Sequence, residues 1–86
     1  MSAGMRRASA SRPLPPPMWR VEVQGHRLQR WTIEAHVLEV PAVDAAHACE
    51  VVVGILHRAA GVPPWKPLIR ESLEHASAAA VDRRRT

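Results

Sequence analysis

Residues 44–64 have the sequence DAAHACEVVVGILHRAAGVPP, which specifies a helix together with both of its ends. Asp44 is a good N-cap, because its carboxylate can accept a hydrogen bond from a free backbone N–H of the first turn. The pattern predicts a helix that runs to Ala60. Gly61 stands where a left-handed C′ residue belongs, Val62 supplies the apolar contact that accompanies it, and two prolines then prevent continuation.

This predicted helix is amphipathic. Its apolar residues recur at the spacing of one helical face, and we expect that face to be buried: Ala45, Ala48, Val52, Ile55, Leu56 and Ala59. The opposite, solvent-facing side is expected to hold His47, Glu50, Gly54, His57 and Arg58. Such a helix needs a second apolar surface to pack against.

The preceding residues predict a β-hairpin that supplies this surface. Apolar and polar residues alternate from Trp19 to Gln24 and again from Arg30 to Val37, with Gly25-His26-Arg27 between the two stretches. A three-residue loop at 25–27 lets both faces of the sheet agree, and a five-residue loop keeps the same parity. The expected cross-strand pairs are Val21–Trp31, Trp19–Ile33 and Glu22–Arg30. Pro41 ends the second strand.

The segment after the helix is compatible with two structures. Pro67 suits the first turn of a second helix, on which one face would carry Ile69, Leu73, Ala76 and Ala80. The alternative is a third strand from Leu68 to about Ala76, since a hairpin alone makes a poor sheet. The predicted fold class is therefore α+β, a β-hairpin followed by an amphipathic helix and then a second helix or third strand.

The 86-residue chain is long enough for one small domain. Residues 1–17 are small, basic and proline-rich, so burial cannot offset their ordering entropy, and we expect a disordered arm. Residues 82–86 form a basic tail. Residues 18–81 remain as the single α+β domain.

The formal net charge of +4 is concentrated at the two ends of the chain. The arm and the tail carry Arg6, Arg7, Arg12, Arg83, Arg84 and Arg85. The domain between them holds slightly more acidic than basic residues, whereas a nucleic-acid-binding fold usually has a basic face. These arginines are therefore the candidate contacts for weak, sequence-independent nucleic-acid binding, and the alternative is that they only keep the chain soluble.

Several classes of protein and site are excluded by composition and spacing. No apolar run is long enough for a membrane span, and the basic N-terminus lacks the apolar core of a signal peptide, so we expect a cytoplasmic protein. The single cysteine, Cys49, rules out an internal disulfide. His47 and Cys49 lack the spacing of metal ligands, and no metal or other cofactor is expected.

We expect no enzymatic activity and no small-molecule substrate, because no catalytic constellation is visible. Glu50 could orient His57, but no nucleophile accompanies them: Cys49 faces elsewhere, and Ser72 and Ser77 lie on another element. No catalytic or cofactor-binding residue is therefore assigned.

The three tryptophans carry all of the large aromatic surface. Trp19 and Trp31 alternate with aliphatic residues, which favours the core over a base-stacking platform. Trp65 and Lys66 lie in a proline-braced loop and are the candidate partner contacts, since Trp is enriched at binding hot spots. The favoured alternative is that Trp65 folds back to cap the core, because so short a core needs the ring's area.

Two blocks carry a family resemblance. They are MWRVEV with the following GHRL and RWTI, at 18–33, and GVPPWKP at 61–67. Over about residues 18–75 the chain resembles small accessory proteins encoded beside the replication and spread genes of actinobacterial conjugative plasmids and integrative elements. The resemblance implies a role in plasmid maintenance or transfer, and it carries over no functional residues.

The hairpin also predicts assembly. Its edges are unpaired, and the strand from Trp31 to Val37 has no proline or lysine to deter another strand. We expect a homodimer, through the hairpin edge or the Val-rich helix, or contact with another protein. The leading hypothesis is a non-enzymatic accessory protein that acts by protein–protein contact, and the alternative is a small DNA- or RNA-binding regulator that uses its basic arms.

Overall fold

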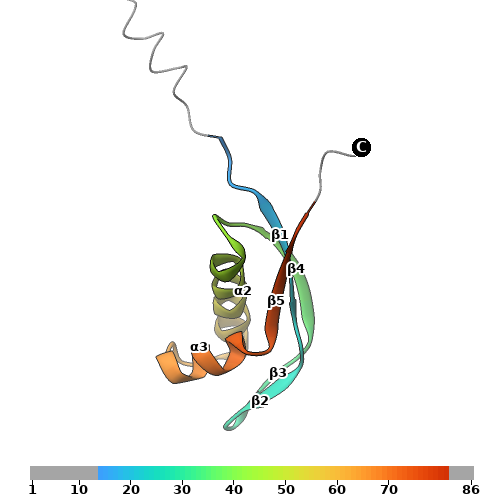
Figure 1. The fold of residues 1–86 in the computed structure, drawn as a ribbon. Coiled ribbons are helices and arrows are strands. Elements are labelled where there is room, and N and C mark those ends of the chain that lie inside the picture. Colours follow the sequence, from blue (N-terminus) through green and yellow to red (C-terminus); the bar gives the residue numbers. More distant parts are fainter. Residues whose placement is uncertain (1–13, 82–86) are drawn as a thin grey trace, which may run out of the picture.

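The computed structural model describes residues 14–81 and confirms an α+β fold (Figure 1). Its elements, in chain order, are β1 (Met18–Val23), β2 (His26–Leu28), β3 (Trp31–Ile33), β4 (His36–Pro41), α2 (Ala45–Ala60), α3 (Lys66–Leu73) and β5 (Ala76–Ala80). One antiparallel sheet has the order β4–β1–β5, and β2 and β3 form a second, two-stranded sheet. Within the described residues, no helix is long and apolar enough to cross a membrane.

The predicted hairpin exists, but its turn and its register were wrong. The chain reverses at Gln29 and Arg30, where Gln29 adopts a φ of 53°, and not at residues 25–27. The observed pairs are Trp19–Val40, Val21–Leu38 and Leu28–Trp31. The same register runs through both sheets, so β1–β2 and β3–β4 are the two arms of one long hairpin, which is interrupted midway.

The interruption explains why the alternation misled the prediction. Val21 and Val23 are buried in β1, but Leu28 is buried in β2, so the inward face changes parity near Gly25. The inward face of the opposite arm changes parity in the same way near Ala35, because Ile33 is buried in β3 whereas Val37 is exposed in β4. A one-residue change of phase moves every later side chain to the other face.

Helix α2 has the predicted ends. The Asp44 carboxylate accepts a hydrogen bond from the His47 N–H at 2.8 Å. Gly61 has a left-handed φ of 77°, and the Val62 N–H donates to the His57 carbonyl at 2.9 Å. Val62 is buried, as the C-terminal motif requires.

The buried face of α2 is rotated from the predicted one. It consists of Ala48, Val52, Val53, Leu56 and His57. Ile55 and Ala59, which we expected in the core, are exposed, and His57, which we expected in solvent, is buried. The reason is that α3 packs beside α2 and covers the side on which His57 lies.

The C-terminal segment forms a helix and then a strand, so neither of the two alternatives holds over its predicted range. Pro67 lies in the first turn of α3, which ends at Leu73, so Ala76 and Ala80 belong to a strand and not to a helical face. This strand, β5, starts where the predicted third strand was to end. It pairs antiparallel with the free side of β1 and turns the hairpin into a three-stranded sheet.

The core lies between this sheet and α2, which covers one face of it (Figure 1). The buried apolar residues come from every element except β5 and include Val21, Val23, Leu28, Ile33, Val40, Val52, Leu56 and Leu68. Trp19 packs against this core and donates its indole N–H to the Ala42 carbonyl at 2.9 Å. On the opposite face of the sheet, Arg20 and Glu39 form an ion pair at 3.7 Å.

Candidate functional site

The residues predicted to contact partners differ in whether the structure describes them. Trp65 and Lys66 are both exposed, at the start of α3. The six arginines of the arm and tail, Arg6, Arg7, Arg12, Arg83, Arg84 and Arg85, lie outside the described residues 14–81. The described candidate surface is therefore the one around Trp65.

Trp65 does not cap the core, contrary to the favoured interpretation of the sequence. Its side chain is 54% exposed. Val62 and Leu68, three residues before and after it, are both buried and occupy the core positions of this segment. Trp65 is consequently held out at the surface, between two residues that anchor its loop.

The backbone around Trp65 is fixed by several hydrogen bonds. The Trp65 N–H donates to the Pro63 carbonyl at 2.8 Å, and the Trp65 carbonyl accepts from the N–H groups of Leu68 and Ile69 at 3.0 and 3.1 Å. Prolines at 63, 64 and 67 further restrict the chain. These contacts fix the backbone from which the indole projects.

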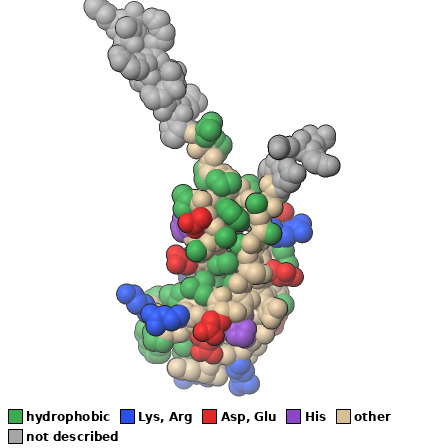
Figure 2. All heavy atoms as spheres, in the orientation of Figure 1, with side chains coloured by type: hydrophobic (Ala, Val, Ile, Leu, Met, Phe, Trp, Pro, Cys, Tyr) green, Lys and Arg blue, Asp and Glu red, His purple; other side chains and the backbone are tan. Residues whose placement is uncertain are grey.

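A second tryptophan supports the first. The rings of Trp31 and Trp65 meet edge to face, with centroids 6.5 Å apart and planes at 85°. The Arg30 guanidinium carbon lies 5.0 Å from the Trp31 ring centroid, within the range of a cation–π contact. We call Arg30, Trp31, Trp65 and Lys66 the Trp31–Trp65 surface. Figure 2 shows Lys and Arg side chains over α3 and near the β2–β3 turn, at this end of the molecule.

A buried histidine–serine cluster is the feature that sequence analysis missed. Ser72 on α3 is 1% exposed, and its Oγ lies 2.7 Å from Nε2 of His26 and 2.7 Å from Nε2 of His57. His75 stacks on His26, with ring centroids 4.2 Å apart. The cluster therefore links β2, α2 and α3, and it corrects the expectation that no hydroxyl lies beside His57.

The hydrogen-bond partners indicate which ring nitrogens of His26 and His57 carry a proton. The Gln24 carbonyl can only accept, so Nδ1–H of His26 donates to it, at 2.8 Å, and Nε2 of a neutral His26 must accept from the Ser72 hydroxyl. Ser72 Oγ then accepts from Nε2–H of His57. Nδ1 of His57 is left as a bare lone pair, which agrees with its being buried without a partner.

The environment of His57 favours the same neutral form. Burial lowers the pKa of His57, and repulsion from His26 lowers it further. A charged imidazole would also bring a second N–H into a place that offers no acceptor. Ser72 is inaccessible and already donates its proton to His26, so this hydroxyl joins three elements and is closed to a substrate.

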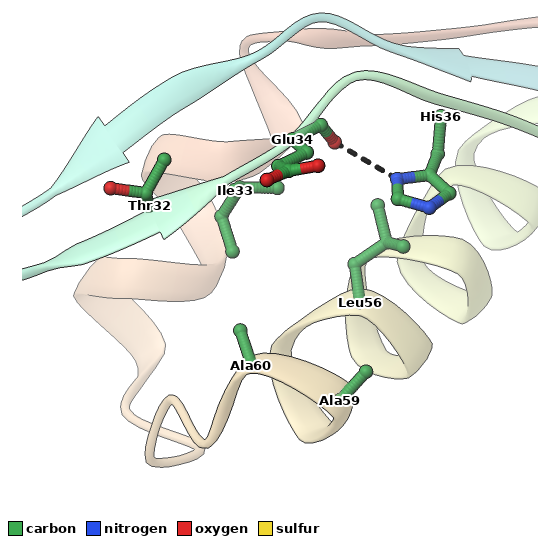
Figure 3. A pocket seen from close by; sticks show the side chains of 7 residues that line it. All are labelled: Thr32, Ile33, Glu34, His36, Leu56, Ala59 and Ala60. Carbon is green, nitrogen blue, oxygen red and sulfur yellow. Dashed lines mark hydrogen bonds between the residues drawn. The ribbon is translucent and has the colours of Figure 1, made fainter.

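Two shallow pockets flank α2. One, of about 260 Å³, lies between its C-terminal half and the bend from β3 to β4 (Figure 3). Its walls include Ile33 and Leu56, and His36 donates from Nδ1 to the Glu34 carbonyl at 3.0 Å. The other, of about 280 Å³, is bounded partly by His57 and Ile69. Both fall below the roughly 300–1,000 Å³ of most small-molecule sites.

In the described part of the chain, no group of three His, Cys, Asp or Glu side chains is arranged so that it could hold a metal ion. Cys49 is partly buried, and burial together with the neighbouring Glu50 raises the pKa of its thiol, which disfavours the thiolate that a metal requires.

The signal that could have located the cluster was weak. Leu68 and Ser72 are spaced i, i+4, which places the serine on the buried face of α3, but this is apparent only once Leu68 is known to be the anchor.

Comparisons of the chain with protein-family models, with curated proteins and with solved structures find no match.

Proposed function

We propose that this protein is a non-enzymatic binding module that contacts another protein through the Trp31–Trp65 surface. The observation that carries the proposal is the 54% exposure of Trp65 in a domain whose small core would gain from burying it. Its exposed part represents a forgone stabilisation of about 3 kcal/mol, at ~25 cal/mol per Å² and roughly 250 Å² for a full tryptophan. A partner that covers the ring would recover that energy as binding energy.

Rigidity makes this surface efficient for binding. Ordering a side chain and its loop during association costs affinity, and here the hydrogen bonds of residues 63–69 already hold the loop in one conformation. The edge-to-face contact with Trp31 restricts the indole itself. The surface thus resembles the rigid aromatic anchors at the centres of protein interfaces.

Charge indicates the chemistry of the partner. Arg30 lies over the Trp31 ring, Lys66 follows Trp65 in the chain, and both cations are exposed. A complementary surface would place an apolar pocket over Trp65 and acidic side chains at its rim, where charges mainly set specificity and association rate. The proposed partner is therefore a protein with an acidic-rimmed apolar site.

The biological setting in this proposal comes from the sequence resemblance of residues 18–75. It supports an accessory role in the maintenance or transfer of a conjugative element, in the cytoplasm, with the partner being another component of that system. The basic arm and tail could add weak nucleic-acid contact to the same role.

Site-specific photo-crosslinking in cells that express the full chain tests the proposal. A photo-reactive amino acid at position 65 should give a discrete crosslinked protein, whereas the same group at Val43, another exposed apolar position, should not. Trp31→Ala should abolish the crosslink from position 65, because it removes the supporting ring. Identical products from both positions, or a product insensitive to Trp31→Ala, would contradict the proposal.

A further inference from the structure

Strand β5 presents an unpaired edge. The Gln24 N–H donates to the His75 carbonyl and the Val81 N–H donates to the Met18 carbonyl, at 2.9 and 3.0 Å. In an antiparallel ladder these bonds direct alternate residues of β5, from 75 to 81, toward β1. The N–H and C=O groups of Ala76, Ala78 and Ala80 therefore point away from the sheet, and no described residue pairs with them.

The other edge of the sheet is protected, and β5 is not. The Ala42 N–H donates to the Pro17 carbonyl at 3.0 Å, and this bond sets which residues of β4 bond to β1. The backbone groups of Val37, Glu39 and Pro41 therefore point away from the sheet. A charge and a proline are the usual deterrents to strand addition. Strand β5 has the sequence ASAAA, with no proline, no charge and no large side chain.

We propose that β5 pairs antiparallel with β5 of a second copy of this chain, about a two-fold axis at Ala78. Ala78 would face Ala78 of the second copy, and Ala76 would face Ala80. All three outward residues then meet outward residues, which gives about six backbone hydrogen bonds. The product is one continuous sheet of order β4–β1–β5–β5–β1–β4.

The edge is self-complementary, which favours a second copy over a strand of another protein. Its methyl and hydroxymethyl side chains offer no pocket or charge to select a foreign sequence, whereas a two-fold axis matches every donor with an acceptor automatically. Each face of the sheet also continues correctly, with the helix-covered side of one copy joining that of the other. Helix α2 contacts β5 as well as β1 and β4, so in the joined sheet the α2 helices of the two copies would cover the same face.

This inference does not depend on the Trp31–Trp65 surface, which lies on other elements. It also places the dimer contact on β5, in place of the hairpin edge or the Val-rich helix that the sequence led us to expect. Failure of either idea would leave the other unchanged, since crosslinking from position 65 and self-association are separate measurements.

Sedimentation equilibrium of the full chain through the micromolar range tests the inference with two proline variants. Ala78→Pro removes an N–H that points outward and makes no bond to β1, so it should weaken dimerisation by at least about tenfold. Val37→Pro is the matched control, because it removes the equivalent outward N–H on β4, and its dimer should be unchanged. A wild-type chain that stays monomeric, or an Ala78→Pro chain that dimerises like wild type, would overturn the inference.

A charge exchange provides a second test that does not alter the backbone. Ser77 and Ala79 are exposed, and in the proposed register Ser77 of one copy lies directly opposite Ala79 of the other. Ser77→Lys with Ala79→Lys should separate the copies at low salt, whereas Ser77→Lys with Ala79→Glu should hold them more tightly. Circular dichroism would verify that each variant is folded, and equal association of the two double variants would refute the register.

Discussion

Ser72 is the residue that depends most on the tertiary structure for its role. One hydroxyl proton and one lone pair satisfy two imidazoles that come from β2 and α2. Neutral His57 is a condition of this arrangement, because its Nδ1 lies buried without a partner. His75 stacks on His26, with ring centroids 4.2 Å apart, and so extends the cluster beyond Ser72.

Stability should therefore fall as the pH is lowered. The pKa of His57 is lower in the folded protein than its ordinary value of 6.5, because burial and His26 both disfavour the charged form. Below about pH 6.5 the unfolded chain binds a proton that the folded chain resists, so stability is complete above that pH and declines as the pH falls toward the folded pKa. Urea midpoints measured from pH 8 to 5 should show this decline.

His57→Leu is the control for this pH dependence. Leucine fills the buried position without a titrating group, so the variant should be less stable at pH 8, where Ser72 loses one of its two partners, but should show a shallower decline below pH 6.5. An unchanged slope in the variant would mean that other groups cause the pH dependence.

The cluster shows where residue-level prediction ended. Its partners are 15 and 46 residues apart in the chain. Placing His57 on the exposed side of the helix followed correctly from its polarity, and the error arose because α3 supplies a hydroxyl that satisfies the ring. The prediction that Trp65 caps the core was wrong for a similar reason, because Val62 and Leu68 fill the core position that the indole was expected to take.

At the scale of elements, the ends of α2 provide a test with opposite expected signs. Gly61 has a φ of 77°, so Gly61→Ala should destabilise the protein by about 1 kcal/mol through the strain of a left-handed alanine. Gly54 lies inside the same helix, and a Cβ there would meet nothing within 4 Å, so Gly54→Ala should stabilise by about 0.5–1 kcal/mol. Urea unfolding measures both, and changes of the same sign would show that the two sites are misassigned.

A helix or strand was predicted correctly where the residues that specify it lie close to it in the chain. The cap Asp44, the terminator Gly61 and the following prolines lie within one turn of the ends they specify, and both ends of α2 were predicted correctly. The hairpin register depends on a simultaneous change of phase near Gly25 and Ala35, which no alternation rule anticipates. Strand β5 is alanine-rich, so its conformation is set by pairing with β1 and not by its own propensity.

For the molecule as a whole, the fold brings together the two points at which the basic end segments join the domain. The Val81 N–H donates to the Met18 carbonyl at 3.0 Å, so the start of β1 and the end of β5 lie side by side (Figure 1). The formal net charge of +4 belongs mainly to those two segments, while the domain between them is close to neutral. The two segments that carry the six arginines are therefore connected to neighbouring strands of the sheet.

Binding to a polyanion should therefore depend on both ends together. Removal of residues 1–12 and 83–86 should abolish retention of the protein on a heparin or DNA column at low salt, because the remaining domain has no excess of positive charge. Removal of either segment alone should lower the salt concentration of elution by a part of that amount, since phosphate contacts contribute roughly additively to the salt dependence. Replacement of the six arginines by glutamine in the full-length chain is the matched control and should reproduce the double deletion. Retention that survives both changes would place the polyanion contact on the domain, with Arg30 and Lys66 of the Trp31–Trp65 surface as the next residues to substitute.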